Sequence, residues 1–307
     1  MHIKRLKLIV IVGPTASGKS ELSVQLAKKL NGEIISADSR QIYRGLNIGS
    51  ARVPGQWKNR RFIYKNVPHY CINFVDPKKT FTVAEFKECA EKAIKDIGDR
   101  RKIPIIVGGT GFWIEALVYN LNLPEVPPNW KLRQILEKKN PFELLKILKK
   151  LDPERANTVE KENPRRLVRA IEIASSLGKV PKIRRQSPYK TLWVGLNPLP
   201  AILIKNLEKR SRLMVSRGII QETKNLLKRG VSKKRVKEFG FEYIATLDYL
   251  EKKILKTELY HRLVRDTSRY AKKQMLWWKN NPKIKWSAIP SKALSYGLSV
   301  PRKRNEE

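Results

Sequence analysis

Hydrophobic residues near the start of the chain form a short, unbroken run. Residues 8–12 read Leu-Ile-Val-Ile-Val, with no polar position among them. This pattern is typical of a strand that is buried on both faces, as strands of parallel sheets are. Leucines then recur at helical spacing at Leu22, Leu26 and Leu30, and residues 33–38, which read Glu-Ile-Ile-Ser-Ala-Asp, predict a second strand. The opening therefore predicts a strand, a helix and a second strand of one α/β unit.

Apolar and charged positions alternate with a helical period over residues 81–97. Thr82 and Glu85 stand where a capping box would start this helix. Residues 103–107 predict a third buried strand, and residues 191–196 predict another strand that returns to the same parallel sheet. Everything beyond that strand is predicted to be helical and rich in Lys and Arg. The pattern as a whole predicts an α/β fold whose parallel sheet is flanked by helices.

The composition changes at Asn120, where a proline-rich stretch interrupts regular structure. A long segment rich in Leu, Lys and Glu follows, which predicts a helical insertion. Its helices are expected over residues 130–139, 141–151 and 164–177. The predicted domains are a core, residues 1–119 and 190–307, and an inserted helical domain, residues 120–189.

Positive charge dominates the composition. The 307 residues include 65 Lys and Arg against 28 Asp and Glu, which gives a formal net charge of +37 and predicts a long anionic partner. The apolar run at residues 8–12 is far shorter than the roughly 20 residues that cross a bilayer, so no membrane partner is expected. Two cysteines, Cys71 and Cys89, are too few for a disulfide framework and lack zinc spacing. A reducing, cytoplasmic compartment is therefore expected.

A phosphate-binding motif lies between the first predicted strand and its helix. Residues 13–20 read Gly-Pro-Thr-Ala-Ser-Gly-Lys-Ser and match the P-loop pattern GxxxxGK[ST]. In such a loop, backbone N–H groups converge on phosphate oxygens, Lys19 bridges the outer oxygens, and the Ser20 hydroxyl can bind Mg²⁺. The sequence thus predicts a site for a diphosphate or triphosphate; a tight turn with an incidental lysine is the alternative. The candidate binding residues are Gly13, Pro14, Thr15, Ala16, Ser17, Gly18, Lys19 and Ser20.

Asp38 ends the second predicted strand, at the edge of the sheet where open α/β folds bind their ligands. A carboxylate at this place can bind Mg²⁺, act as a general base, or cap its own loop. The residues alone leave these three roles open.

Six short segments, spread over most of the chain, carry a family resemblance. They include Ala-Asp-Ser-Arg-Gln-Ile-Tyr-Arg at 37–44, Gly-Gly-Thr-Gly at 108–111 and Arg-Tyr-Ala-Lys-Lys-Gln at 269–274, with others at 13–20, 163–172 and 210–218. In these segments the chain resembles the bacterial tRNA dimethylallyltransferases, also called tRNA isopentenyltransferases. That family transfers the dimethylallyl group of dimethylallyl diphosphate to the N6 amine of the adenosine 3′ of the anticodon, in tRNAs reading codons that begin with U, and releases diphosphate.

The resemblance implies a fold, partners and roles. The fold would be a P-loop NTPase-like parallel core with an inserted helical domain that contacts tRNA. The partners would be the anticodon stem-loop of tRNA and dimethylallyl diphosphate, and the working unit is expected to be a monomer. Asp38 would be the general base that takes a proton from the adenine amine. Thr15 and Arg210 would be catalytic because, with Lys19 and Ser20, they would hold the diphosphate as its charge grows, and Mg²⁺ would share that charge.

The resemblance also implies a set of tRNA-binding residues, some of which could have a purely structural role instead. Thr110 could instead cap a helix, the three arginines at 165–169 could form a solvated helix face, and at least one of Trp277 and Trp278 is expected in the core. The set is Asp38, Ser39, Arg40, Gln41, Thr110, Arg165, Arg166, Arg169, Arg269, Lys272 and Lys273.

Three places depart from the family's usual residues: Phe241 replaces a tyrosine, Phe112-Trp113 replaces the common Leu-Tyr pair, and Asn206 stands where arginine is frequent. These departures leave the transfer chemistry intact and concern the tRNA contacts. Two other functions fit the motifs. One is an adenylate isopentenyltransferase that acts on free AMP, ADP or ATP, and the other is an RNA-binding P-loop kinase or NTPase.

Overall fold

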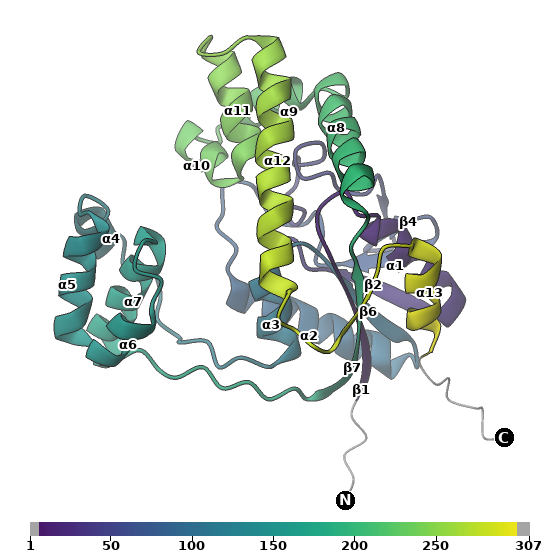
Figure 1. The fold of residues 1–307 in the computed structure, drawn as a ribbon, viewed down its shortest axis with the longest axis horizontal. Coiled ribbons are helices and arrows are strands. Elements are labelled where there is room, and N and C mark those ends of the chain that lie inside the picture. Colours follow the sequence, from purple (N-terminus) through teal and green to yellow (C-terminus); the bar gives the residue numbers. More distant parts are fainter. Residues whose placement is uncertain (1–5, 300–307) are drawn as a thin grey trace, which may run out of the picture. The chain divides into compact units, whose positions relative to one another are not determined.

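The computed structural model describes residues 6–299. These residues divide into two compact units (Figure 1). The first comprises the described residues up to Tyr119 and from Ser187 onward, and we call it the core unit. The second is Asn120–Gln186, the helical unit.

An eight-stranded sheet forms the centre of the core unit. Every neighbouring pair from β5 to β8 is parallel, whereas β3, β4 and β5 are joined in antiparallel fashion. The mixed, mostly parallel sheet confirms the predicted α/β fold class. In spatial order the strands are β3 (Gln56–Lys58), β4 (Arg61–Tyr64), β5 (Val67–Tyr70), β2 (Gly32–Ser36), β6 (Ile103–Val107), β1 (Leu6–Val12), β7 (Tyr189–Leu196) and β8 (Ile284–Ser287).

The unbroken apolar run in β1 is explained by helices on both faces of the sheet. Leu8 and Val10 belong to one hydrophobic cluster, together with α2 (Val83–Asp99) and α3 (Gly111–Val118). Ile9 and Ile11 belong to the other, together with α1 (Lys19–Leu30) and α13 (Pro290–Leu298). Because successive side chains of a strand point to opposite faces, each residue of the run is buried, and none can be polar.

Two local predictions about the helices of the core unit are confirmed. Thr82 accepts a hydrogen bond from the backbone N–H of Glu85, and the Glu85 side chain accepts one from the Thr82 N–H, so the capping box starts α2. Trp278, at the end of α12 (Lys256–Trp278), is 1% exposed and packs against Trp193. The neighbouring Trp277 is 39% exposed. One member of the tryptophan pair therefore belongs to the core.

The prediction that only helices follow residues 191–196 is wrong. β8 lies beside β7 in parallel, with Ile284 paired to Trp193. This four-residue segment follows Lys283 and contains Lys285, and it is too short to predict a strand by itself, so its pairing with a distant strand decides its conformation. The sequence also did not predict the antiparallel strands β3, β4 and β5. The remaining helices of this unit are α8 (Pro200–Ser216), α9 (Ile219–Lys228), α10 (Lys233–Glu238) and α11 (Phe241–Leu250).

The helical unit has a small hydrophobic core of its own, which includes Leu144, Leu148 and Leu167. An Asn or Asp side chain accepts a hydrogen bond at the start of each of its four helices, which satisfies backbone N–H groups that have no partner within a helix. These are α4 (Trp130–Leu136), α5 (Pro141–Leu151), α6 (Pro153–Thr158) and α7 (Pro164–Leu177). The three predicted helices are present, and α6 is an addition.

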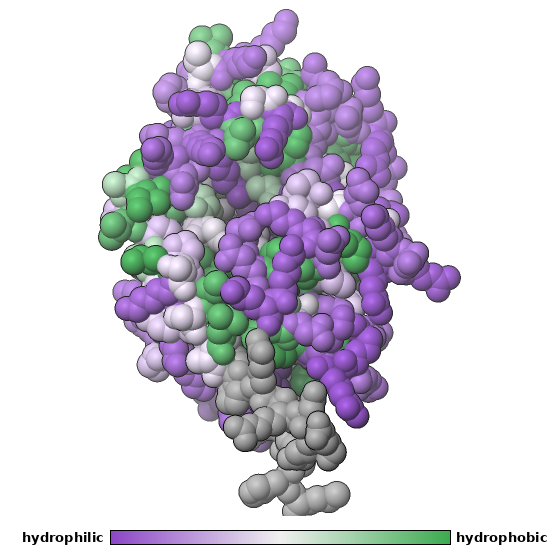
Figure 2. All heavy atoms as spheres, turned by 90° about the vertical axis from the view of Figure 1, so that its right-hand side faces the viewer, coloured by the Kyte–Doolittle hydropathy of each residue, from purple (hydrophilic) through white to green (hydrophobic). Residues whose placement is uncertain are grey.

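Hydrophilic side chains cover most of the molecular face shown in Figure 2, with hydrophobic residues scattered between them. Among the residues that the structure describes, no helix combines the length and the apolar character that crossing a membrane requires.

A buried carboxylate on α9 ties together two distant parts of the core unit. Glu222 is 7% exposed and accepts hydrogen bonds from the backbone N–H groups of Asn47, Ile48 and Gly49, at 2.7, 2.8 and 2.9 Å. It also accepts one from the Tyr243 hydroxyl at 2.8 Å. Four donors on one carboxylate fix the loop that leads to the pocket residues Ser50 and Ala51.

Replacing Glu222 with glutamine is expected to lower the free energy of unfolding by about 2–4 kcal/mol. The amide keeps the volume but turns an N–H₂ group toward backbone donors and leaves buried polar groups unpaired. Urea unfolding followed by circular dichroism measures the change. Glu88→Gln is the matched control, because Glu88 is exposed on α2 and its ion pair with Lys92 across one helical turn is also exposed. Equal stabilities of the two variants would contradict the prediction.

Candidate functional site

The P-loop lies at the carboxyl end of β1, where the chain turns into α1. Gly13 has φ +140°, and a Cβ there would stand 2.2 Å from the carbonyl oxygen of Leu196 at the end of β7. Gly18 has φ +92° and is the N-cap of α1, so Lys19 is the first helical residue. Both positions thus need glycine, and the turn brings the N-terminus of α1, with its partial positive charge, to the pocket that Gly18 and Lys19 line.

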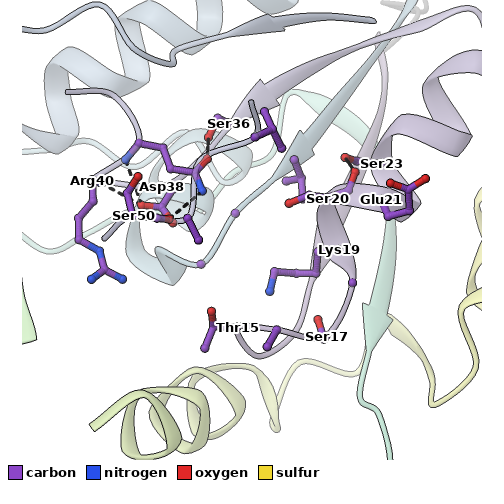
Figure 3. A pocket seen from close by; sticks show the side chains of 18 of the residues that line it. Thr15, Ser17, Lys19, Ser20, Glu21, Ser23, Ser36, Asp38, Arg40 and Ser50 are labelled. Atoms are coloured by element: carbon purple, nitrogen blue, oxygen red, sulfur yellow. Dashed lines mark hydrogen bonds between the residues drawn. The ribbon is translucent and has the colours of Figure 1, made fainter. Parts of the chain in front are cut away.

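Lys19 extends its amine into a pocket of about 170 Å³ (Figure 3). Its Nζ donates a hydrogen bond to the Pro14 carbonyl at 2.5 Å. Burial, and next the positive charge of Arg210, lower the pKa of Lys19 to about 7. The amine therefore sits near the midpoint of its titration at neutral pH and would gain charge when an anion arrives.

Asp38 lies on the other side of the same pocket, just beyond β2 (Figure 3). Its Oδ1 accepts the backbone N–H of Arg40 at 2.9 Å, so the carboxylate does cap its own loop. Oδ2 receives no hydrogen bond from the residues that the structure describes. The loop packs closely against the end of β6, because a Cβ on Gly108 would stand 2.1 Å from the Ala37 carbonyl oxygen. Capping by one oxygen leaves the other available for chemistry.

Thr110 is the N-cap residue of α3, but its side chain makes no hydrogen bond to that helix. Its hydroxyl accepts the backbone N–H of Ser39 at 3.1 Å and lies 3.4 Å from the Ser39 hydroxyl. Thr110 therefore fastens the loop that carries Asp38 instead of capping a helix with its side chain. The predicted neighbours Ser39 and Thr110 are brought together, and Gln41 lines the pocket beside them.

Two residues of α12, neither of them among the predicted site residues, complete the pocket wall. Gln274 accepts the backbone N–H of Thr15 at 2.7 Å and donates to the carbonyl of Gly109 at 3.0 Å. Tyr270, one helical turn earlier, lies 3.4 Å from the same carbonyl. Spacing of four residues puts both on one face of the helix, which is the signal that could have found them.

Arg40 is held by three groups that the sequence did not connect with it. Its guanidinium is ion-paired with Glu242, whose side chain is 1% exposed, and it lies 5.3 Å from the ring centre of Tyr270 and 5.7 Å from that of Phe241. Burial alone would lower the pKa of Arg40, but the negative charge of Glu242 raises it above its usual value. Arg40 is therefore a fixed cation on the pocket wall.

Two buried polar atoms at the pocket have no hydrogen-bond partner among residues 6–299. They are Ser17 Oγ in the P-loop and Nε of Arg210 on α8. Both residues line the pocket, and burial is the main cause that lowers the pKa of Arg210. Unpaired donors beside a P-loop are the groups that a phosphate oxygen would satisfy.

The basic residues predicted to bind tRNA fall into two sets. Arg269, Lys272 and Lys273 are exposed on α12, on faces other than the one that carries Gln274. Arg165 and Arg166 are exposed on α7 of the helical unit, whereas Arg169 donates to the carbonyl of Val126 and pairs with the buried Glu172. Arg169 is thus committed to contacts within its own unit.

The three departures from the family pattern have structural explanations. Asn206 donates its side-chain amide to the carbonyl of Ala16 in the P-loop at 3.2 Å. Trp113 is 6% exposed and stacks on Phe86 in the core. Phe241 is one of the rings beside Arg40. Asn206 and Phe241 therefore support the pocket, and Trp113 supports the core.

Comparison with known proteins shows to which family the chain belongs. The family model described as IPP transferase matches residues 41–281, and a model described as isopentenyl transferase matches residues 6–65. A tRNA dimethylallyltransferase of Pelotomaculum thermopropionicum is 38% identical over 93% of this chain and 92% of its own length. That of Anoxybacillus flavithermus is 36% identical over 91% and 89%. The chain belongs to the tRNA dimethylallyltransferase family.

Solved structures support the same assignment. The tRNA isopentenylpyrophosphate transferase of Bacillus halodurans is 33% identical, covers 95% of this chain and 94% of its own, and superimposes with a TM-score of 0.69. A eukaryotic dimethylallyltransferase acting on tRNA is 28% identical, with a TM-score of 0.76 and coverage of 98% and 81%. The tRNA dimethylallyltransferase family therefore shares the fold of this chain along nearly its whole length.

Binding of an alkyl diphosphate at pH 8 is expected to take up about one proton. Lys19 is mostly neutral above its pKa of about 7, and an incoming anion favours the ammonium form. An alkyl diphosphate is suitable because the last ionisation of a phosphate group lies near about pH 6, so the ligand is already fully ionised. Isothermal titration calorimetry in buffers of different ionisation enthalpy counts the protons.

The matched control is Lys19→Arg, whose charge does not titrate in this range and which should take up no proton. Uptake in the unsubstituted protein should also decline as the pH falls toward 7. A wild-type binding enthalpy that is independent of the buffer at pH 8 would contradict the assignment.

Proposed function

We propose that the protein transfers the dimethylallyl group of dimethylallyl diphosphate to the N6 amine of the adenosine 3′ of the anticodon, in tRNAs reading codons that begin with U, and releases diphosphate. The observation that carries this proposal is the single pocket that has the P-loop on one side and Asp38 on the other. A diphosphate held by the loop would present its allylic carbon to an amine beside the carboxylate. Membership of the tRNA dimethylallyltransferase family supports the same reaction.

Two groups of residues would divide the work. The amine attacks the allylic carbon as the carbon–oxygen bond breaks, and Asp38 accepts the proton that the amine loses. The P-loop amides, Thr15, Lys19 and Arg210 would hold the departing diphosphate, whose charge grows in the transition state. The adenine must leave its stack to reach this pocket, because its amine is otherwise inaccessible.

The donor set of the pocket fits Mg²⁺, which would neutralise charge on the diphosphate. The Ser20 hydroxyl at the start of α1 and the carboxylate of Asp38 are hard oxygen donors. Among residues 6–299 no cluster of three or more His, Cys, Asp or Glu could hold a metal without other ligands. Mg²⁺ commonly takes its remaining ligands from phosphate and water, and we assign Ser20 as its protein ligand.

A tRNA partner accounts for the net charge of +37, because neutralising phosphates with Lys and Arg dominates nucleic-acid affinity. We assign the tRNA contacts to Ser39, Arg40, Gln41 and Thr110 near the base, with Arg269, Lys272 and Lys273 on the backbone. Arg165 and Arg166, which are exposed on α7, would contact the RNA from the helical unit, whereas Arg169 would stabilise that unit through Glu172 and Val126. The enzyme would work as a monomer in the cytoplasm, where its tRNA substrate is found.

The proposed reaction can be tested directly with labelled dimethylallyl diphosphate and two unmodified transcripts of one tRNA that reads UNN codons. The first carries adenosine 3′ of the anticodon and should take up label at that position, mapped by nuclease digestion and mass spectrometry. The second carries guanosine there and should remain unlabelled. Adenosine monophosphate in place of tRNA separates the proposal from the adenylate-specific alternative.

Label on neither RNA would reject the proposed reaction. Faster, salt-insensitive labelling of the free nucleotide would favour the adenylate isopentenyltransferase, since a small acceptor makes too few phosphate contacts for a strong salt dependence. Release of phosphate from ATP on RNA binding, without any use of dimethylallyl diphosphate, would favour the kinase or NTPase.

Asp38→Asn is expected to lower the single-turnover rate by about 10²–10⁴ while leaving tRNA affinity within a few-fold, because the amide keeps the shape but cannot accept the proton. Arg210→Ala should lower the rate by about 10²–10³ through loss of a donor to the diphosphate. Rapid-quench kinetics gives the rates, and filter binding gives the affinity. Asp99→Asn, on the exposed end of α2, is the matched control. Turnover by Asp38→Asn at the control rate would limit Asp38 to its loop cap.

A further inference from the structure

The two cysteines of the chain lie against each other, although 18 positions separate them. The Sγ atoms of Cys71 and Cys89 are 2.6 Å apart, and both are free thiols. Two sulfur atoms in ordinary van der Waals contact stand farther apart than this, and a disulfide needs about 2.05 Å. A shift of about half an ångström would therefore bring the pair to bonding distance.

We propose that Cys71 and Cys89 are a redox modification site, which a small-molecule disulfide converts to an intramolecular disulfide. This inference is independent of the proposed reaction, because neither sulfur lines the P-loop pocket. The two cysteines also differ in exposure to solvent, so a small disulfide can reach one of them more easily than the other. Cys71 is 5% exposed, whereas Cys89 on α2 is half-buried.

The surface around the pair gives a small oxidant access to it. Both cysteines line a second, open pocket of the core unit, together with Glu88 and Lys92 on α2. The contact with Cys71 is the main cause that lowers the pKa of Cys89, and the positive charge of Lys92 acts in the same direction. The same contact and burial raise the pKa of Cys71. Cys89 is therefore the first nucleophile and Cys71 the resolving thiol.

The exchange balances in two steps. The Cys89 thiolate attacks one sulfur of the small disulfide, forms a mixed disulfide, and expels one small thiolate that takes up a proton. Cys71 then loses its proton and attacks Cys89 Sγ, which releases the second small thiol. Two protein thiols and one small disulfide become one protein disulfide and two small thiols.

The bond would anchor a strained loop that supports the catalytic segment. Cys71 has φ +53°, a left-handed conformation that costs a residue other than glycine free energy. Just beyond it, the N–H groups of Asn73 and Phe74 donate to the carbonyls of Gln41 and Ile42 at 2.9 and 2.8 Å. The loop after Cys71 thus carries the segment that follows Asp38. A covalent link to α2 would restrict opening of this loop. It would also reduce the conformational entropy of the unfolded chain, so we expect greater thermal stability.

The test compares the protein equilibrated with excess oxidised glutathione and with reduced dithiothreitol. After unfolding and alkylation, the oxidised sample should show no free thiol and no glutathione adduct by intact mass, and a peptide that joins Cys71 to Cys89. Its melting temperature should be about 5–10 °C higher than that of the reduced sample.

Cys89→Ser is the matched control. It should melt at one temperature under both conditions, because the remaining thiol has no partner, and its folding shows that the substitution is tolerated. Two alkylated thiols in the glutathione-treated wild type would overturn the proposal, as would stable glutathione adducts on both cysteines. An unchanged melting temperature on formation of the bond would refute the stabilising role.

Discussion

Basic side chains that are partly withdrawn from water line the pocket of the core unit, and holding them there is the requirement that the rest of the structure must meet. Lys19, Arg40 and Arg210 line one pocket, and Asp38 and the exposed Glu21 are the acidic residues that share its lining. Burial lowers the pKa of Lys19 and Arg210, because a charge withdrawn from water is unfavourable without a counter-ion. An anionic ligand such as the proposed diphosphate would favour the charged forms, so its binding would offset part of this unfavourable burial.

The scaffold must hold these charges in place, and it does so through contacts that reach far along the chain. Glu242 lies behind Arg40, and Gln274 joins the P-loop to the turn after β6. Glu222 fixes the loop before Ser50 through three backbone N–H groups. Each contact satisfies a buried polar group that would otherwise weaken the fold. The same interactions that stabilise the core unit therefore define the geometry of the pocket.

Local signals carried most of what the sequence could predict. The P-loop occupies eight consecutive residues, and the capping box of α2 needs only Thr82 and Glu85. Asp38 was found because carboxyl ends of parallel strands meet at one edge of a sheet. Glu242 was missed because an acidic residue early in a helix usually faces solvent, and only the fold brings it to Arg40. β8 also depends on a distant contact, since pairing with β7 decides its conformation.

Helix α12 shows how one element can serve both parts of the proposed reaction. Its Tyr270 and Gln274 face the pocket, whereas Lys272 and Lys273 are exposed to solvent. A helix is rigid over this length, because each turn is held by its own backbone hydrogen bonds. A polyanion bound to the exposed lysines would therefore restrain the same helix that positions the Thr15 amide. Substrate RNA would contact one face of α12, and the P-loop that holds the departing diphosphate contacts another face. The position of the bound RNA would therefore affect the position of the Thr15 amide.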